Sequence, residues 1–474
     1  MATRSRRKPD APAATTARRP YLTVDERRAQ GRALREKVPR SSHAEWKAPE
    51  DRRDPVELLQ GSNDGRMETL VPVRFGRMSA SPFAFYRGAA ALMAADLAHT
   101  PTTGIRVQAC GDAHLMNFGG FATPERNVIF DINDLDETLP APWEWDLKRL
   151  AASVVIAAQF LKLSESEAAR AARDMACEYR ERMTNYAAMR VLDVWYDRID
   201  LQRYQDRSAD PDVMAEVHKR MADRIAEAQR KNVPEYLYPK LVELQGEEHR
   251  IKDELPLIFH PDEALAPGVR SGFASAIAGY RDSLPEHVRT LFDRYRFRDL
   301  AVKVVGVGSV GTFCSVGLFM AEENDPLFLQ VKEARASVLE PYAGKSLHPN
   351  HGQRVIVGQR LMQSASDVFL GWTEGEQGKH FYLRQLRDLK MSAVIEDWDF
   401  GLLRQYVRMC AHALARAHAR SGDAALISGY AGSGQTFDDA IADFAVAYSD
   451  QNRADYRRFI KAIRQGRVEV QNDI

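Results

Sequence analysis

Residues 110–117 read Cys-Gly-Asp-Ala-His-Leu-Met-Asn, and residues 130–134 read Phe-Asp-Ile-Asn-Asp at the end of a short apolar stretch. In this arrangement Asp112 lies five residues before Asn117, and Asp131 follows on the next predicted strand. Phosphoryl transfer needs an orienting carboxylate and charge neutralisation by Mg²⁺, which prefers oxygen ligands. The spacing therefore predicts a magnesium-dependent phosphoryl-transfer centre of the protein-kinase type.

Each polar side chain in these two stretches has a candidate role. Asp112 would orient or deprotonate an acceptor hydroxyl, and Asn117 and Asp131 would bind Mg²⁺. Asp134 and Asp136 are further oxygen donors suited to a hard cation. A calcium loop is the competing idea for this oxygen-rich run, but the spacing does not fit an EF-hand.

A glycine-rich segment follows almost two hundred residues later. It matches G-x-G-x-x-G at Gly306, Gly308 and Gly311. A dinucleotide-binding fold requires a helix directly after such a loop, whereas residues 312–320 look extended. Strand, glycine loop, strand, turn and strand is the kinase order, in which backbone N–H groups cover nucleotide phosphates. Lys332 on the third strand is the candidate ligand of the phosphates, and ATP and Mg²⁺ are the predicted cofactors.

The order of these motifs is the reverse of the order in kinases, because Asp112 precedes Gly306. A circular permutation cut between the helix predicted at 402–419 and the catalytic loop would explain this order, since permutation is tolerated at surface termini. The helix predicted near 351–363 has no Glu. The acidic partner of Lys332 is therefore unassigned.

Residues 111–117, in the pattern Gly-Asp-x-His-x-x-Asn, resemble the catalytic loop of aminoglycoside and choline phosphotransferases. The resemblance implies that Asp112 is the catalytic base and that Asn117 binds metal. It also implies that Asp131 is the metal-binding aspartate and that Asp146 is the structural aspartate that starts the following helix.

Two departures from that family are visible in the sequence. Cys110 stands where the family commonly has His, and residues 132–133 are not the usual aromatic continuation. The second departure leaves open whether Asp131 or Asp134 is the main metal ligand. His114 is predicted to support the loop as a hydrogen-bond partner.

A second resemblance covers roughly residues 60–450. The chain resembles a bacterial family of uncharacterised proteins, known as domain of unknown function 2252, which implies no substrate. The shared phrases are Arg77-Met78 with 81–83, 111–114, 131–134, 331–334 and 384–388.

The elements together predict an α+β fold: a two-lobed protein-kinase-like fold, circularly permuted, with large helical additions. We expect a disordered basic arm at 1–60, the catalytic-loop and metal-aspartate part of the C-lobe at 61–162, a helical part of the C-lobe at 163–295, a β-rich nucleotide-binding N-lobe at 296–390 and a helical return to the C-lobe at 391–474.

The composition excludes several classes of function. Lys+Arg and Asp+Glu are both 66 in 474 residues, so there is no global basic field for nucleic acid. Apolar runs are far shorter than a bilayer span. No apolar core follows the N-terminal arginines, so we expect no secretory signal. The four cysteines are widely separated. We therefore expect a cytoplasmic protein without a membrane span.

Other functions stay open. The missing helix Glu favours a non-enzymatic nucleotide-binding protein, a pseudokinase, and transfer of AMP is a related variant. A metal-dependent hydrolase would use Asp112, His114, Asp131 and Asp134 but leaves the glycine loop unexplained. The predicted acceptor is a hydroxyl-bearing small molecule or protein, and the sequence gives no signal for its identity or for the oligomeric state.

Three arginines surround the segment at 81–85. Arg74, Arg77 and Arg87 could bind phosphate or carboxylate groups of a ligand. Surface ion pairs are the more common explanation for such residues.

Overall fold

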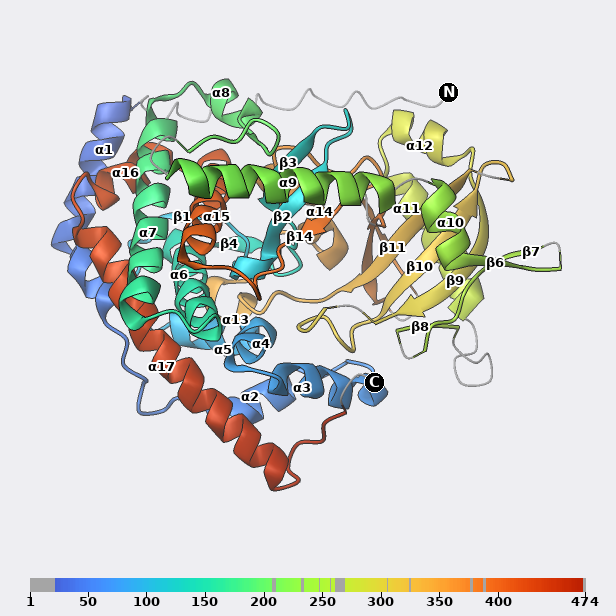
Figure 1. Ribbon diagram of the computed structural model, residues 1–474, viewed down its shortest axis with the longest axis horizontal. Helices are drawn as coiled ribbons and strands as arrows, with labels where there is room; N and C mark the ends of the chain where they lie inside the picture. Colours follow the sequence, from blue (N-terminus) through green and yellow to red (C-terminus); the bar gives the residue numbers. More distant parts are fainter. Residues whose placement is uncertain are drawn as a thin grey trace, which may run out of the picture.

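The computed structural model describes residues 22–206, 210–231, 234–246, 248–255, 257–260, 269–304, 306–323, 325–375, 378–386 and 389–471. The predicted α+β class is confirmed by the presence of long helices and several β-sheets. Figure 1 shows a helix-rich part on one side, a sheet-rich part on the other, and β2 and β3 between them. In the part of the chain that the structure describes, no helix is both long and apolar enough to cross a membrane.

Four long helices form the helix-rich part: α6 (Trp143–Phe160), α7 (Glu165–Ala188), α15 (Phe400–Ser421) and α17 (Thr436–Arg464). α15 packs along α7, and α17 packs against both α6 and α7. α7 begins at a capping box in which Ser164 and Glu167 satisfy each other's backbone N–H groups. The helix predicted at 402–419 is confirmed as α15.

The shorter helices surround this bundle or cover the sheets. They are α1 (Val24–Ala33), α2 (Pro55–Gly61), α3 (Val71–Ser79), α4 (Pro82–Gly88), α5 (Ala90–Leu97), α8 (Val191–Tyr196), α9 (Pro211–Lys231), α10 (Pro234–Leu241), α11 (Val269–Ser283), α12 (Glu286–Phe292), α13 (Glu340–Ala343), α14 (His351–Met362) and α16 (Ala424–Ala431). Short 3-10 turns are η1 (Leu34–Glu36), η2 (Arg40–Ala44), η3 (Glu68–Leu70) and η4 (Leu115–Asn117).

The expected disordered arm at 1–60 needs a correction. Residues 1–21 lie outside the described residues, but α1, η1, η2 and α2 form between residues 22 and 61. α1 packs on α16 so closely that a Cβ on Gly31 would lie 2.1 Å from the Leu426 carbonyl oxygen. Arg35 donates to the carbonyl of Tyr430 at 2.8 Å. Tertiary packing orders this polar segment, and its weak sequence periodicity gave no sign of that.

The sheet-rich part is built on six antiparallel strands in the order β12-β13-β11-β10-β9-β8. Their bounds are β8 (Ile258–Phe259), β9 (Arg296–Lys303), β10 (Cys314–Met320), β11 (Pro326–Ala334), β12 (Gly371–Glu374) and β13 (His380–Gln385). Every residue of β10 is buried. The sheet is therefore covered on both faces, which explains the continuous apolar run that the sequence shows there.

The two faces of this sheet correct the predicted boundary at residue 295. Phe319 packs with Phe273 and Phe292, which belong to α11 and α12, on one face. Leu318 lies in the apolar cluster of the other face, with Val242 of the hairpin β6 (Val242–Gln245) and β7 (Glu248–Ile251). Residues from about 242 to 295 thus belong to the sheet-rich part. Helical periodicity identifies an apolar face but not the partner that covers it.

A smaller sheet carries the two polar stretches that opened the sequence. Its order is β14-β2-β3-β5, with β2 (Phe118–Ala122), β3 (Val128–Ile132), β5 (Ile199–Asp200) and β14 (Met391–Ser392). β1 (Arg106–Ala109) pairs with β4 (Leu139–Pro142). The loop after β1 carries Asp112, and the loop between β3 and β4 carries Asp134 and Asp136. Both loops therefore leave β-structure close to the same point.

Candidate functional site

One face of α6 holds the loop after β1. Asp146 accepts hydrogen bonds from the backbone N–H groups of Cys110 at 2.6 Å and Gly111 at 2.9 Å. Seven residues on, Ser153 accepts from the N–H of Leu115 at 2.9 Å. Residues at this spacing share one side of a helix. The sequence-predicted supporting residue Asp146 thus lies directly under the loop, where its carboxylate also contacts His418.

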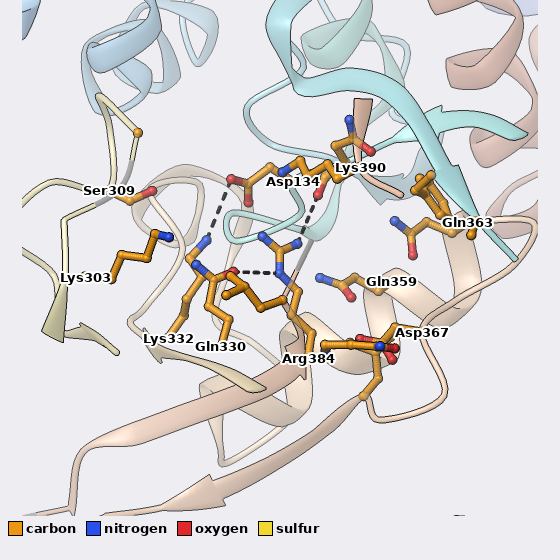
Figure 2. Close-up of a pocket in the computed structure, with 17 residues that line it drawn as sticks. Asp134, Lys303, Ser309, Gln330, Lys332, Gln359, Gln363, Asp367, Arg384 and Lys390 are labelled. Atoms are coloured by element: carbon orange, nitrogen blue, oxygen red, sulfur yellow. Dashed lines mark hydrogen bonds and ion pairs between the residues drawn. The ribbon is translucent and has the colours of Figure 1, made fainter. Parts of the chain in front are cut away.

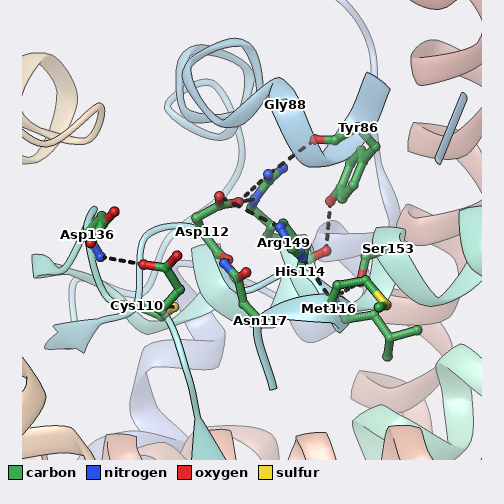
Figure 3. Close-up of polar contacts among 12 residues, drawn as sticks. Tyr86, Gly88, Cys110, Asp112, His114, Met116, Asn117, Asp136, Arg149 and Ser153 are labelled. Atoms are coloured by element: carbon green, nitrogen blue, oxygen red, sulfur yellow. Dashed lines mark hydrogen bonds and ion pairs between the residues drawn. The ribbon is translucent and has the colours of Figure 1, made fainter. Parts of the chain in front are cut away.

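Asp112 is held by an arginine that the sequence reasoning missed. Arg149 Nε donates to Asp112 Oδ1 at 2.7 Å, and its Nη2 donates to the same oxygen (Figure 3). Burial alone would lower the pKa of Arg149, but Asp112, with Tyr86, raises it above its ordinary value. Arg149 stands three residues after Asp146 on α6, so helical spacing was the available signal for its contact with the loop.

Asn117 closes the loop from its other end. Its side-chain N–H₂ donates to the backbone carbonyl of Asp112 at 2.7 Å. This bond directs the amide oxygen away from that carbonyl, which leaves it available to a cation. His114 caps η4 by accepting from the Met116 N–H at 3.1 Å, and its Nε2 lies 3.9 Å from Asp112 Oδ2. Burial lowers the pKa of His114 to about 4, so its ring is neutral at pH 7.

The structure does not bring Asp131 to the same place. Its carboxylate is fully buried and lies 2.5 Å from Arg416 Nη2 of α15. It also accepts from the backbone N–H of Ser364 at 2.9 Å and from the Ser364 hydroxyl at 3.1 Å. All these partners are protein groups, and Asp131 lines neither of the cavities described below. An arginine inside the apolar run at 414–417 was the sequence signal for a buried partner.

Lys332 of β11 instead meets the two later aspartates. Lys332 Nζ lies 2.5 Å from Asp136 Oδ2 and 3.7 Å from Asp134 Oδ2. The Tyr382 hydroxyl donates to the other oxygen of Asp136, and its ring lies below the ammonium group. Although burial alone would lower the pKa of Lys332, Asp134 and Asp136 raise it well above its ordinary value. The acidic partner that α14 lacks is therefore supplied by the loop after β3.

The glycine loop joins β9 to β10 and is tied to the N-terminal segment at 66–77. Gly306 and Gly311 have φ values of +71° and +88°, which favour glycine. Arg66 Nη1 donates to the Val310 carbonyl at 2.6 Å, and the Gly311 carbonyl accepts from the Met67 N–H at 2.7 Å. Segments far apart in the sequence therefore fix this loop.

Two cavities meet at Asp134 and Ser309. The smaller, of about 330 Å³, lies between the six-stranded sheet, α14 and β2 (Figure 2). Figure 2 shows Lys332 directed at Asp134 and Arg384 beside Gln330. The smaller cavity is lined by four cationic residues: Lys303, Lys332, Arg384 and Lys390. Burial, with the neighbouring Arg384, lowers the pKa of Lys390 to about 8, as expected in an electropositive cavity.

The larger cavity, of about 520 Å³, opens on the other side of Asp134. It contains Asp112 and Asn117 from the first loop and Gly308 from the glycine loop. Asp134 and Ser309 line both cavities. Of the predicted site residues, Asp112, Asn117, Asp134, Gly306, Gly308 and Lys332 line one or both cavities, whereas Asp131, His114, Asp146 and Gly311 do not.

The candidate metal ligands are oxygen atoms, but they do not form a dense cluster. Within the described ranges, no three His, Cys, Asp or Glu side chains are grouped as a ready metal site. Asp134 and Asn117 supply a carboxylate and an amide oxygen beside a cationic cavity. Such a set suits a cation that keeps several waters and binds together with phosphate oxygens, as Mg²⁺ does.

Comparison with known proteins identifies the family. Searches of curated proteins and of solved structures gave no match. A family model described as "Uncharacterized protein conserved in bacteria (DUF2252)" matches residues 66–462. This range includes the Asp112 loop, the glycine loop and Lys332, and it covers most of the 474 residues. The chain belongs to the DUF2252 family.

Proposed function

We propose that this protein is a Mg·ATP-dependent phosphotransferase with a kinase-like, circularly permuted arrangement. The contact of Lys332 with Asp136 at 2.5 Å and with Asp134 at 3.7 Å carries the proposal. These carboxylates lie almost two hundred residues before the lysine, next to Asp112 and Asn117. Charged groups converge from separate parts of the chain on a shared cavity edge, which favours a ligand site over an isolated surface ion pair.

The smaller cavity suits a nucleotide. Its four cations favour a polyphosphate, and Phe121 and Leu386 add apolar surface for a base. Lys332 lies on the third of three successive antiparallel strands, after the glycine loop between the first two. That is the kinase order of phosphate-binding parts. Asn117 and Asp134 would hold Mg²⁺, which when bound would neutralise charge on the β- and γ-phosphates.

Asp112 is the proposed base. Both hydrogen bonds from Arg149 end on Oδ1, which leaves Oδ2 for an acceptor hydroxyl. In the transfer, the acceptor oxygen forms a bond to the γ-phosphorus while the bond from that phosphorus to the bridging oxygen breaks. The electron pair leaves on ADP, and the hydroxyl proton passes to the Asp112 carboxylate.

The end of α15 supports the permuted order. Ser421, its last residue, accepts a hydrogen bond from the Gln108 N–H of β1 at 3.1 Å. A chain in kinase order would pass from such a helix into the strand before the catalytic loop. Asp423, just beyond, caps α16 by accepting from the N–H groups of Ala425 and Leu426, which is a structural task.

A nucleotide-binding protein without turnover is the second candidate. Its supporting observation is that both key side chains are engaged by protein groups: Lys332 by Asp136 and Asp112 by Arg149. A hydrolase has less support, because His114 Nδ1 is occupied by the Met116 N–H and Asp131 is paired with Arg416.

Calorimetric titration of Mg·ATP into the full chain tests the first proposal. Lys332→Met and Asp134→Asn should each weaken binding about tenfold or more, since each removes a charge that contacts phosphate or metal. Lys219→Met, on the exposed side of α9, is the matched control and should bind as the wild type does. Wild-type affinity in both site variants would sink the assignment.

Turnover is measured separately. Incubation with Mg·ATP and hydroxyl acceptors, followed by mass spectrometry, distinguishes a gain of phosphate from a gain of AMP. Phosphorylated product supports the first proposal, and loss of that product in Asp112→Asn supports the base. Tight nucleotide binding without any ADP or AMP release across the panel would favour the second candidate.

A further inference from the structure

We propose that the larger cavity binds the oxyanion of the second substrate, a phosphomonoester or carboxylate group, through four arginines. They are Arg66, Arg74, Arg87 and Arg335. This inference deepens the proposed function and rests on it, because the cavity is taken as the acceptor side of the transfer. The acceptor class would then be a hydroxyl compound that also carries an anionic group.

The arginines come from separate elements and line one cavity. Arg66 precedes η3, Arg74 belongs to α3, Arg87 to α4, and Arg335 follows β11. Asp112, which also lines this cavity, is close enough to Arg87 to raise the pKa of that guanidinium, although burial outweighs this effect. An anion held by the arginines would place the rest of its molecule near the proposed base.

The hydrogen bonds of three of these arginines go to neutral groups, although carboxylates such as Glu137 and Glu333 also line the cavity. Arg66 donates to the Val310 carbonyl, Arg335 to the Asp64 backbone carbonyl, and Arg74 to the Asn63 side-chain oxygen at 2.5 Å. Arg87 Nε is buried without a hydrogen-bond partner. Among the residues that the structure describes, no carboxylate lies within 4.0 Å of a guanidinium nitrogen of these four.

Most buried arginines elsewhere in the described chain contact a carboxylate, whereas Arg354 donates only to backbone carbonyls. Arg52 contacts Asp96 and Asp455, both at 2.7 Å, and Arg180 contacts Asp438 at 2.9 Å. A buried cation without a counter-ion is costly, and guanidinium groups bind carboxylate and phosphate in two-bonded geometry. Four such guanidinium groups around one cavity therefore point to an anionic ligand.

The arginines also lower one another's pKa values. Burial, together with the Arg335 charge, lowers the pKa of Arg66 to about 10, although Glu137 and Glu333 act in the opposite direction. Burial lowers the pKa of Arg74 as well, and both Arg66 and Arg335 add to that shift. A bound oxyanion would relieve this repulsion.

The nucleotide is not the expected partner of this cluster. The smaller cavity has its own four cations, and none of the four arginines lines it. Among the described lining residues, only Asp134 and Ser309 are shared between the cavities. A nucleotide whose phosphates contact Lys332 would therefore leave the arginines available for another anion.

The test titrates inorganic phosphate, and separately acetate, into the full chain saturated with Mg²⁺ and a non-hydrolysable ATP analogue. We expect one of the two anions to bind, and its binding to weaken about tenfold in Arg87→Gln and in Arg335→Gln. Both side chains are partly exposed, whereas Arg74 is fully buried and is left intact. Arg35→Gln is the matched control, because Arg35 also donates to backbone carbonyls but lines neither cavity.

The outcomes separate this inference from the proposed function. Anion binding that persists with the analogue bound and falls only in the cavity variants supports the inference, and the preferred anion identifies the chemical group. Displacement of the anion by the analogue, or no binding of either anion, overturns it and leaves nucleotide binding intact. Loss of nucleotide binding with arginine-dependent anion binding retained would overturn the proposed function but keep the anion site.

Discussion

Replacing Arg416 with Met tests whether Asp131 belongs to the core rather than to a metal site. Arg416 Nη2 lies 2.5 Å from Asp131 Oδ1, and both side chains have 0% exposure. Methionine fills much of the space but leaves the carboxylate with only the bonds from Ser364 and from the N–H of the neighbouring Ile132. Removing one partner of a buried ion pair costs about 3–5 kcal/mol, so the free energy of unfolding should fall by that amount.

Urea denaturation followed by circular dichroism measures this loss. The double variant Arg416→Met, Asp131→Leu removes both charges and should recover most of it, because replacing a whole buried pair by apolar groups is often neutral. Arg420→Met, one turn further along α15, is the control. Arg420 donates to three backbone carbonyls and stacks on Trp195, but its replacement leaves no buried charge unpaired, so the loss should be smaller, about 1–2 kcal/mol.

Two results would refute the reasoning. One is an unchanged unfolding midpoint in Arg416→Met. The other is an Asp131→Asn variant that keeps its stability but loses Mg²⁺-dependent ATP binding, since that would make Asp131 a ligand after all. If Asp131 belongs to the core, Asp134→Asn and not Asp131→Asn should reduce nucleotide binding directly, with little change in stability.

Three further predictions concern other parts of the chain. Burial lowers the pKa of Lys148 to about 7 from its ordinary value near 10.5. Between these two pH values the unfolded chain binds more protons than the folded chain, so stability rises with pH. Lys148→Met should therefore raise the urea midpoint at pH 7 and flatten the rise of stability with pH. The hydrogen bond to Asp299 outweighs burial and raises the pKa of His260. The stability that this ion pair contributes is therefore full below about pH 6.5 and is lost as pH rises through the raised pKa. In His260→Asn, the urea midpoints measured at pH 5.5 and pH 8 should lie closer together than in the wild type. Gly111→Ala places a Cβ 2.4 Å from a backbone carbonyl oxygen at φ +82°, whereas Gly104 has a similar φ of +80° with open space around it. Gly111→Ala should therefore lower the melting temperature clearly more than Gly104→Ala. Equal decreases would contradict the close packing of the loop.

Local patterns were enough for much of the fold and for half of the candidate site. The capping box at Ser164 and Glu167 and the apolar periodicity after it fixed α7. The Asp112–Asn117 spacing and the strand that carries Lys332 were visible for the same reason, because neighbours in sequence set backbone geometry and the identity of each loop. No long-range information was needed for these features.

Tertiary structure decided which of these groups meet. Asp131 pairs with Arg416, which lies 285 residues later in the sequence, and so lies in the core, whereas Asp134 lines both cavities. Lys332 found its acidic partner in Asp136, 196 residues earlier, where the sequence offered only a helix without Glu. The sequence by itself determined the α+β elements and the polar loops. Only folding could decide the pairing of charges, because the cost of burying a charge depends on which distant side chain packs against it.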